Sequence, residues 1–160
     1  MVRGNAGRAG VTHGLDTSFL VAAEVAGHPD HMAARTLAAS LRNQGDRFAL
    51  APQALAEFAH IVTDPKRFTA PLTMPQALER GQVWWDSSDV ERVWPDESAV
   101  AWFLTAMTKH QLGRKRVLDT LLAGTFRSAR ITSLLTLNPA DFAVFGEFTC
   151  LPLAAPAAQT

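Results

Sequence analysis

Four acidic residues in this 160-residue chain are of the type that binds divalent cations, and they stand at comparable places in its pattern of apolar segments. Asp16 and Asp141 each follow a short apolar segment, whereas Glu57 and Asp119 lie within apolar helical repeats. Four carboxylates in one small site would repel one another and would not all stay ionised unaided. A divalent cation removes that conflict, and Mg²⁺ or Mn²⁺ prefers oxygen ligands together with several waters. If the four acids converge, they predict a metal site that can hydrolyse a phosphodiester bond.

Each acid taken alone has a structural explanation that is more common than a catalytic one. Asp16 can cap a helix, and Glu57 can be a solvated surface acid. Asp119 stands in a first helical turn, where the helix dipole favours an acid. Asp141 can form a capping box with Asn138. The catalytic hypothesis therefore depends on whether the elements bring all four acids together.

Apolar segments and turn residues predict an alternation of strands and helices. The predicted strands span residues 11–15, 48–51, 90–94, 131–135 and 148–153. The predicted helices follow residue 16 and span 31–43, 52–64, 74–86, 98–112 and 117–129, with a short helical turn at 141–142. Strands separated by helical segments imply crossover connections and a parallel sheet covered by helices on both faces, which is a three-layer α/β architecture. The carboxyl ends of such strands meet at one edge, so we expect the acids to converge there.

Local signals mark the ends of several of these elements. Gly14 is expected to weaken the first strand, because glycine has no side chain to pack there. Thr17 or Ser18 is expected to cap the first helix, and Asp30 the second. Pro52 suits the first turn of the third helix, where a missing N–H costs nothing.

Composition excludes several classes of protein. The 15 basic and 15 acidic residues give a formal net charge of zero, which argues against strong attraction of the whole molecule to nucleic acid. A single cysteine, Cys150, excludes an intrachain disulfide framework and a cysteine-built zinc site. No apolar run approaches the length that spans a membrane, and no secretion signal is visible, so a cytoplasmic location is expected. We expect one domain at residues 11–153, with a flexible leader at 1–10 and a mobile tail at 154–160.

Four stretches of the sequence, in order, carry the acids within longer motifs. They are Leu15-Asp16-Thr17-Ser18, Leu55-Ala56-Glu57-Phe58, Val117-Leu118-Asp119-Thr120-Leu121-Leu122-Ala123 and Thr136-Leu137-Asn138-Pro139-Ala140-Asp141-Phe142. These stretches resemble the ordered motifs of PIN domains, and most of all those of VapC-type toxins from bacterial type II toxin–antitoxin pairs. The segment Thr63-Asp64-Pro65-Lys66-Arg67-Phe68 also resembles that group. The resemblance extends from about residue 12 to residue 153.

The resemblance implies a PIN-like α/β/α domain with a central, mostly parallel twisted sheet. It also implies a Mg²⁺- or Mn²⁺-dependent endoribonuclease that a VapB-type antitoxin silences. A homodimer is expected as well, with the apolar helices between residues 74 and 112 as its interface.

The resemblance also assigns roles to single residues. Asp16 and Asp119 would be the principal metal ligands. Glu57 and Asp141 would complete the acidic cluster, either as ligands through water or by orienting the attacking water. Three further residues would support the site: Thr136 as a hydroxyl beside the metal or the substrate phosphate, Asn138 in a mainly structural role, and Ser18, where many members of the family have asparagine, as a local cap.

Further residues have two interpretations that the sequence leaves open. Arg114, Lys115 and Arg116 can contact RNA phosphates or form a solvated basic loop. The four tryptophans, Trp84, Trp85, Trp94 and Trp102, can stack on bases, although packing in the core or a dimer interface is the more common role.

Three histidines invite a metal-binding interpretation that their surroundings do not favour. His28 and His31 flank a proline turn, and no acid or third histidine nearby shares a helix face with them, which disfavours a zinc site. His13, beside the first strand, is expected to be structural.

Two other functions compete with the nuclease. In an aspartyl-phosphate phosphohydrolase, Asp16 would be the nucleophile. Such enzymes usually carry a second acid two positions later as general acid, and Ser18 stands there instead. A non-catalytic PIN-like module that only binds a partner would be favoured by the loss of one or more acids, and all four are present.

Overall fold

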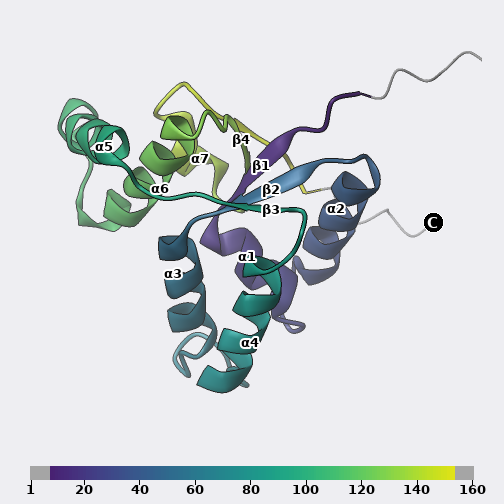
Figure 1. Ribbon diagram of the computed structural model, residues 1–160. Helices are drawn as coiled ribbons and strands as arrows, with labels where there is room; N and C mark the ends of the chain where they lie inside the picture. Colours follow the sequence, from purple (N-terminus) through teal and green to yellow (C-terminus); the bar gives the residue numbers. More distant parts are fainter. Residues whose placement is uncertain (1–7, 154–160) are drawn as a thin grey trace, which may run out of the picture.

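Short apolar segments pair into a five-stranded sheet in a computed structural model that describes residues 8–153 (Figure 1). All strand pairs are parallel, and the strand order is β3-β2-β1-β4-β5. The strands are β1 (Thr12–Leu15), β2 (Arg47–Leu50), β3 (Val90–Arg92), β4 (Ser133–Leu135) and β5 (Thr149–Cys150). The expected tail at 154–160 and most of the expected leader, residues 1–7, lie outside the described residues.

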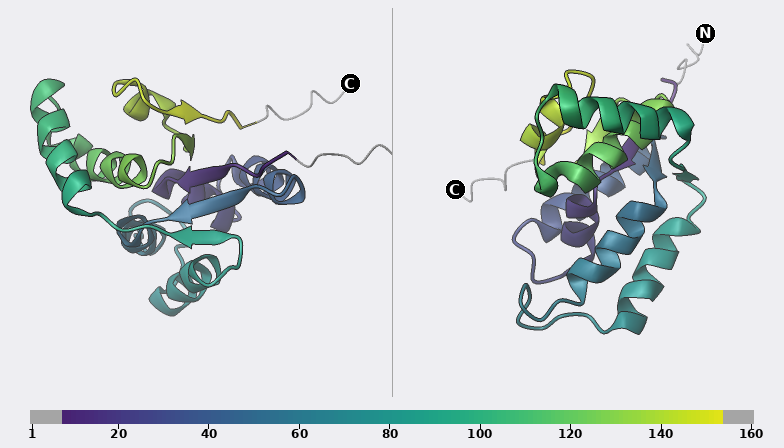
Figure 2. Two further views of the ribbon diagram at one scale, coloured as in Figure 1. Left: turned by 45° about the horizontal axis from the view of Figure 1, so that its top comes forward. Right: turned by 90° about the vertical axis from the view of Figure 1, so that its left-hand side faces the viewer.

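Helices cover both faces of the sheet, which confirms the three-layer α/β/α prediction. They are α1 (Thr17–Glu24), α2 (His31–Asn43), α3 (Pro52–Val62), α4 (Met74–Trp85), α5 (Glu97–Lys109), the 3₁₀ helix η1 (Arg114–Arg116), α6 (Val117–Ser128) and α7 (Pro139–Ala143). In Figures 1 and 2, α1 to α4 lie on one side of the sheet and α5 to α7 on the other. Between residues 8 and 153, no helix is both long enough and apolar enough to cross a membrane.

The division of the helices follows from the order of the strands. The chain moves from β1 to β2 and then to β3, and it returns to the far side of β1 for β4 and β5. Because parallel crossovers are right-handed, reversing the direction of travel transfers the connecting helices to the opposite face. The reversal leaves a crevice at the carboxyl ends of β1 and β4, where ligands bind in open α/β sheets.

The glycine in β1 allows α6 to approach the sheet closely. A Cβ atom on Gly14 would lie 2.8 Å from Leu134 Cδ2 and 2.9 Å from Phe126 Cδ2, closer than carbon atoms pack. Phe126 is fully buried and belongs to a single apolar core that includes Phe19, Phe48 and Phe58. Gly14 was expected to weaken β1, yet the strand pairs with both β2 and β4. The missing side chain makes room for α6 on the sheet.

Helix capping differs from the sequence-based expectation. Asp16, rather than Thr17 or Ser18, occupies the position before α1, and its side chain makes no capping hydrogen bond there. Asp30 precedes α2 as expected, also without a side-chain cap. The hydroxyls of Thr17 and Ser18 are bonded to other side chains instead. The capping prediction for these two residues was therefore wrong, because tertiary partners compete for the same hydroxyls.

A buried polar network ties the strands together at the edge opposite the crevice. His13 Nδ1 lies 2.7 Å from Ser133 Oγ, and His13 Nε2 lies 3.0 Å from Asp46 Oδ2. Asp46 also accepts a hydrogen bond of 2.9 Å from the backbone amide of Val11. These contacts join β1 to β4 and to the turn before β2, which gives His13 the structural role expected of it.

Candidate metal centre

Asp16 is held at the end of β1 by two hydroxyl groups from distant parts of the chain. Its Oδ2 atom accepts hydrogen bonds of 2.6 Å from Ser18 Oγ and 2.7 Å from Thr136 Oγ1. Each hydroxyl in turn accepts a backbone amide: Leu137 N donates to Ser18 at 2.9 Å, and Asn138 N donates to Thr136 at 3.0 Å. The start of α1 and the end of β4 therefore orient Asp16 jointly.

Glu57 projects toward the same edge from the second turn of α3. Its Oε2 atom accepts a hydrogen bond of 2.8 Å from Thr17 Oγ1. Thr17 is the residue after Asp16, so one short segment positions two of the four acids. Thr17 was expected only to cap a helix, because a hydroxyl next to an acid does not reveal its partner 40 positions away.

Arg116 lies between the remaining two acids, Asp119 and Asp141. Its Nε atom is 3.9 Å from Asp119 Oδ2, and its Nη1 atom is 3.7 Å from Asp141 Oδ1. Its Nη2 atom also donates to the backbone carbonyl of Asp141. These contacts join η1 to α7 and place one positive charge beside two carboxylates.

The four carboxylates lie close enough to act on one another. Burial, followed by the charges of Asp16, Asp141 and Glu57, raises the pKa of Asp119 to about 7. The nearby Arg116 opposes that shift. Burial also raises the pKa of Asp16, against hydrogen bonds that lower it. The structure thus brings together all four acids that the sequence singled out, and they share one electrostatic environment.

The arrangement suits a hydrated cation better than a closed protein cage. Among residues 8–153, no group of three or more His, Cys, Asp or Glu side chains is arranged so that it could hold a metal ion. Mg²⁺ does not need so many protein ligands, because it usually keeps several waters and binds through one or two carboxylates. Burial and the neighbouring carboxylates together raise the pKa of Asp119 and so disfavour its ionised form, which a divalent cation would favour. The side chains present therefore fit Mg²⁺ or Mn²⁺.

A cleft of about 680 Å³ opens beside Asp16, Glu57 and Asp119. Asp141 does not line it. Its other polar or aromatic lining includes Lys115, a candidate RNA contact from the sequence, and three residues that the sequence did not assign to the site: His28, Arg67 and Phe68. These three residues lie in loops, where apolar periodicity gives no signal.

The other candidates fall outside the acidic cluster. His31 Nδ1 lies 2.9 Å from the carbonyl of Ala22, while His28 faces the cleft, so the two do not form a metal pair. Arg114 and Lys115 are exposed. The tryptophan rings pack against other rings, as in the pairs of Trp84 with Phe48, Trp85 with Trp94, and Trp102 with Phe145.

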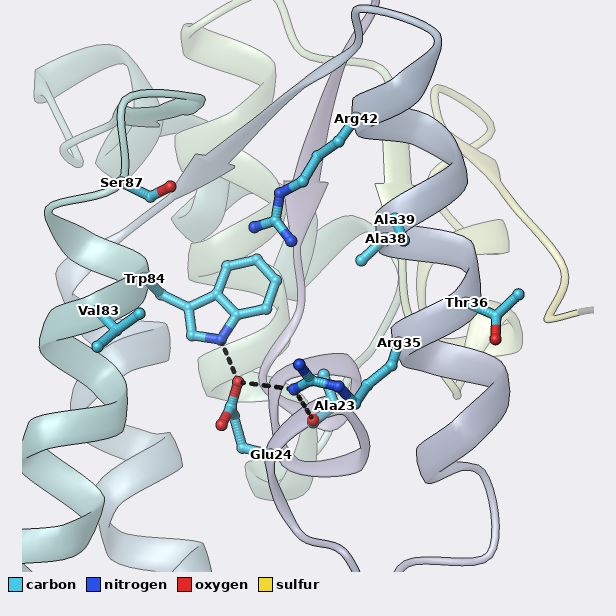
Figure 3. Close-up of a pocket in the computed structure, with 10 residues that line it drawn as sticks. All are labelled: Ala23, Glu24, Arg35, Thr36, Ala38, Ala39, Arg42, Val83, Trp84 and Ser87. Carbon is cyan, nitrogen blue, oxygen red and sulfur yellow. Dashed lines mark hydrogen bonds and ion pairs between the residues drawn. The ribbon is translucent and has the colours of Figure 1, made fainter.

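A second hollow, of about 400 Å³, lies between α2 and α4 and contains none of the four acids (Figure 3). Its polar groups are bonded to one another. Trp84 Nε1 donates to Glu24 Oε1 at 2.7 Å, and Arg35 Nη1 lies 3.8 Å from the same oxygen and donates to the carbonyl of Ala23. These bonds give the hollow a structural explanation.

The protein is thus an α/β domain with a parallel sheet whose switch point gathers four carboxylates, three of which line an open cleft. The family model of the PIN domain matches residues 15–146, so the chain belongs to the PIN domain family, as its four motifs predicted. A comparison with curated proteins finds no match.

Three solved structures share the fold at low sequence identity. VapC20 of Mycobacterium tuberculosis, a sarcin–ricin loop cleaving toxin, is 18% identical with a TM-score of 0.66, over 85% of this chain and 95% of the other. VapBC2 from Rickettsia felis, bound to a promoter DNA fragment, is 16% identical with a TM-score of 0.61, over 88% and 98%. VapBC-1 from nontypeable Haemophilus influenzae is 17% identical with a TM-score of 0.59, over 88% and 97%. The likeness to these VapC and VapBC structures establishes the fold.

The raised pKa of Asp119 predicts an unusual pH dependence of stability for the metal-free protein. The folded state binds a proton on Asp119 that the unfolded state releases, because the pKa is about 7 in the fold and near 3.8 without it. Stability should therefore fall as the pH rises from about 4 through about 7. Asp119→Asn removes this penalty, so in EDTA at pH 8 it should melt at a higher temperature than the wild type. For a domain of this size, each kcal/mol of added stability raises the melting temperature by about 2–4 °C, and solvent screening reduces the gain. Thermal melts at pH 5 and pH 8 measure the difference.

Two further variants control this experiment. Glu91→Gln neutralises an exposed acid on β3 and should leave the difference between the two pH values unchanged. Arg116→Gln removes the charge that lowers the pKa of Asp119 and should enlarge the loss of stability at pH 8. Equal melting temperatures for wild type and Asp119→Asn at pH 8 would contradict the proposed electrostatic coupling.

Proposed function

We propose that this protein is a Mg²⁺- or Mn²⁺-dependent endoribonuclease and the toxin of a type II toxin–antitoxin pair. The observation that carries the proposal is the convergence of four carboxylates at the switch point, where burial and the charges of the other three acids raise the pKa of Asp119 to about 7. Membership of the PIN domain family supports it, and so does the fold shared with VapC20, which is described as cleaving the sarcin–ricin loop. The reaction would take place in the cytoplasm.

Asp16 and Asp119 would hold the divalent cation, with Glu57 and Asp141 acting through water. A bound cation supplies neutralisation of phosphate charge and lowers the pKa of a bound water. Ser18 and Thr136 fix the carboxylate of Asp16, and Thr17 fixes that of Glu57. Asn138 contributes through its backbone amide, which donates to Thr136.

The basic residues before α6 divide into two roles under this proposal. Arg114 and Lys115 are exposed and suit contacts with RNA phosphates. Arg116, which is paired with Asp119 and Asp141, would balance the charge of the acidic cluster and lie near enough to reach a phosphate bound there.

No observation favours the competing functions. For a phosphohydrolase with Asp16 as nucleophile, the residue two positions later should act as a general acid, but the Ser18 hydroxyl donates to Asp16 itself. A module that only binds a partner has no need of four carboxylates that repel one another at some cost in stability.

If the protein is this nuclease, cleavage of RNA should require a divalent metal ion and both principal ligands, Asp16 and Asp119. Purified protein should cut RNA with Mg²⁺ or Mn²⁺ and not in excess EDTA. Removing a residue that orients a metal ligand typically lowers activity ~10–100-fold, and the cleavage rate of Thr136→Val should fall by that much. The cleavage rates of Asp16→Ala and Asp119→Ala should fall further. Gel electrophoresis of end-labelled RNA gives the rates.

Glu91→Gln, on an exposed acid away from the cleft, should cleave like the wild type. Cleavage that persists in EDTA, or full activity of both alanine variants, would overturn the assignment.

The toxin role predicts a growth phenotype and a partner. The Rickettsia felis and Haemophilus influenzae structures are named as VapBC proteins, which supports a VapB-type antitoxin as partner of this chain. Expression of this protein alone should arrest bacterial growth, and co-expression of a neighbouring small reading frame should relieve the arrest. Growth curves with wild type and Asp119→Ala separate toxicity by cleavage from toxicity by overexpression. Arrest by the Asp119→Ala variant to the same degree would contradict the proposal.

We also propose a homodimer that uses the helices between residues 74 and 112. Several large apolar side chains of α4 and α5 are exposed, including Leu78, Val83 and Leu104, at 57%, 68% and 59%. Burial of such side chains between two copies would be favourable. Light scattering of the purified protein should give twice the mass of one chain, and a monomer at micromolar concentration would contradict this interface.

A further inference from the structure

The part of the cleft that extends away from the carboxylates has a composition of its own. It runs between α1 and α3, which both begin near the carboxyl edge of the sheet. Val21 lies about 8 Å along α1 from Asp16, and Ile61 lies about 6 Å along α3 from Glu57, at 1.5 Å per residue. Beyond the ends of these helices, His28 and the pair Arg67 and Phe68 complete the lining, and Lys115 lies on the wall formed by η1 and α6. We call this part of the cleft the distal groove.

The loop after α3 is held in a defined shape. Asp64 accepts hydrogen bonds at its carbonyl from the amides of Arg67 and Phe68, at 3.1 and 3.2 Å, and at its side chain from the amide of Lys66, at 2.8 Å. Leu72 N donates to the carbonyl of Val62 at 2.9 Å and closes the loop. These bonds fix the backbone that carries Arg67 and Phe68, and the Phe68 ring packs in part against the apolar core. A ring held in this way loses little entropy when a ligand binds.

The polar groups of the distal groove are suited to an anion. The Arg67 side chain is 58% exposed, and its ion pair with Asp64 is long, at 3.6 Å. His28 Nδ1 accepts a hydrogen bond of 3.0 Å from the amide of Asp30, so the neutral ring carries its proton on Nε2 and can donate with it. Lys115 adds an exposed ammonium group.

We propose that the distal groove is a subsite for an unpaired nucleotide next to the bond that is cleaved. The ring of Phe68 stacks on the base, and Arg67 and His28 contact the adjoining phosphate. An aromatic ring among cations is the combination that binds single-stranded nucleic acid. In a duplex the bases are already stacked on one another, so the substrate class is single-stranded RNA or an RNA loop. This inference rests on the nuclease function proposed above.

The test measures base stacking independently of cleavage. A short single-stranded RNA that contains the fluorescent base 2-aminopurine is titrated with the full-length protein in excess EDTA. Wild-type protein should quench the fluorescence, because 2-aminopurine loses emission when it stacks. Phe68→Leu should bind about 5- to 150-fold more weakly and lose the quenching, whereas Phe68→Tyr should retain both. Arg67→Gln should weaken binding and reduce its salt dependence.

Matched variants at the opposite edge of the sheet serve as controls. Phe148→Leu changes another partly buried aromatic residue, before β5, and Arg47→Gln removes an exposed arginine at the start of β2. Neither should alter the titration. Circular dichroism tests whether Phe68→Leu is folded. If this variant is unfolded, the comparison of Arg67→Gln with Arg47→Gln decides whether the distal groove binds the RNA.

The outcomes separate this inference from the nuclease proposal. Quenching by wild type that is lost in Phe68→Leu, without metal-dependent cleavage of any RNA, would support base stacking in the distal groove and overturn the nuclease. Cleavage with Mg²⁺ together with equal quenching, or none, by wild type and Phe68→Leu would overturn the subsite alone. A Phe68→Leu variant that quenches normally but loses affinity for a protein partner would assign the groove to that partner instead.

Discussion

The mutual repulsion of four carboxylates is the constraint that the arrangement of this fold must satisfy. Each acid comes from a different part of the chain and has a different source of compensation. Asp16 has two hydroxyl donors, Glu57 has one, and Asp119 and Asp141 share the charge of Arg116. The compensation is incomplete, because burial and the charges of the other three acids together still raise the pKa of Asp119 to about 7. Incomplete compensation at a cleft is typical of functional sites, where local stability is given up for chemistry.

The hydroxyl pair on Asp16 links the chemistry to the topology of the sheet. Ser18 belongs to the helix that follows β1, and Thr136 follows β4, 118 positions later, yet their oxygens lie 3.3 Å apart. β1 and β4 are neighbours only because the chain reverses its direction of travel across the sheet. The same reversal that opens the crevice thus supplies the groups that orient its first acid. Changing the order of the strands would remove both.

The zero net charge of the chain conceals a separation of charge within the cleft. Acids occupy the edge of the sheet, while Arg67 and Lys115 line other parts of the same cleft. A polyanion that enters meets cations and an aromatic ring, and its approach to the acids is favourable only once their charge is reduced. Whole-chain charge argued against strong attraction to nucleic acid, and the local distribution permits a specific contact. Both statements hold, because at an ionic strength of about 0.1 M screening confines the effects of exposed charges to about 10 Å.

The sequence by itself determined the order and type of the elements, since apolar periodicity is a local property. The helix α2 has the predicted bounds, and the other helices end within a few residues of them. The four ordered motifs around Asp16, Glu57, Asp119 and Asp141 likewise pointed to the PIN domain family, to which the chain belongs.

Only the tertiary structure decided which groups act on those acids. Thr17 and Ser18 were assigned as caps, but their hydroxyls bond to Glu57 and Asp16. Arg116 was one of three equivalent basic residues until folding placed it between two carboxylates. Hydrogen-bond partners, burial and pKa depend on segments far apart in the chain, and no local pattern encodes them. The sequence therefore located the acids, and packing across the sheet decided their charge, orientation and neighbours.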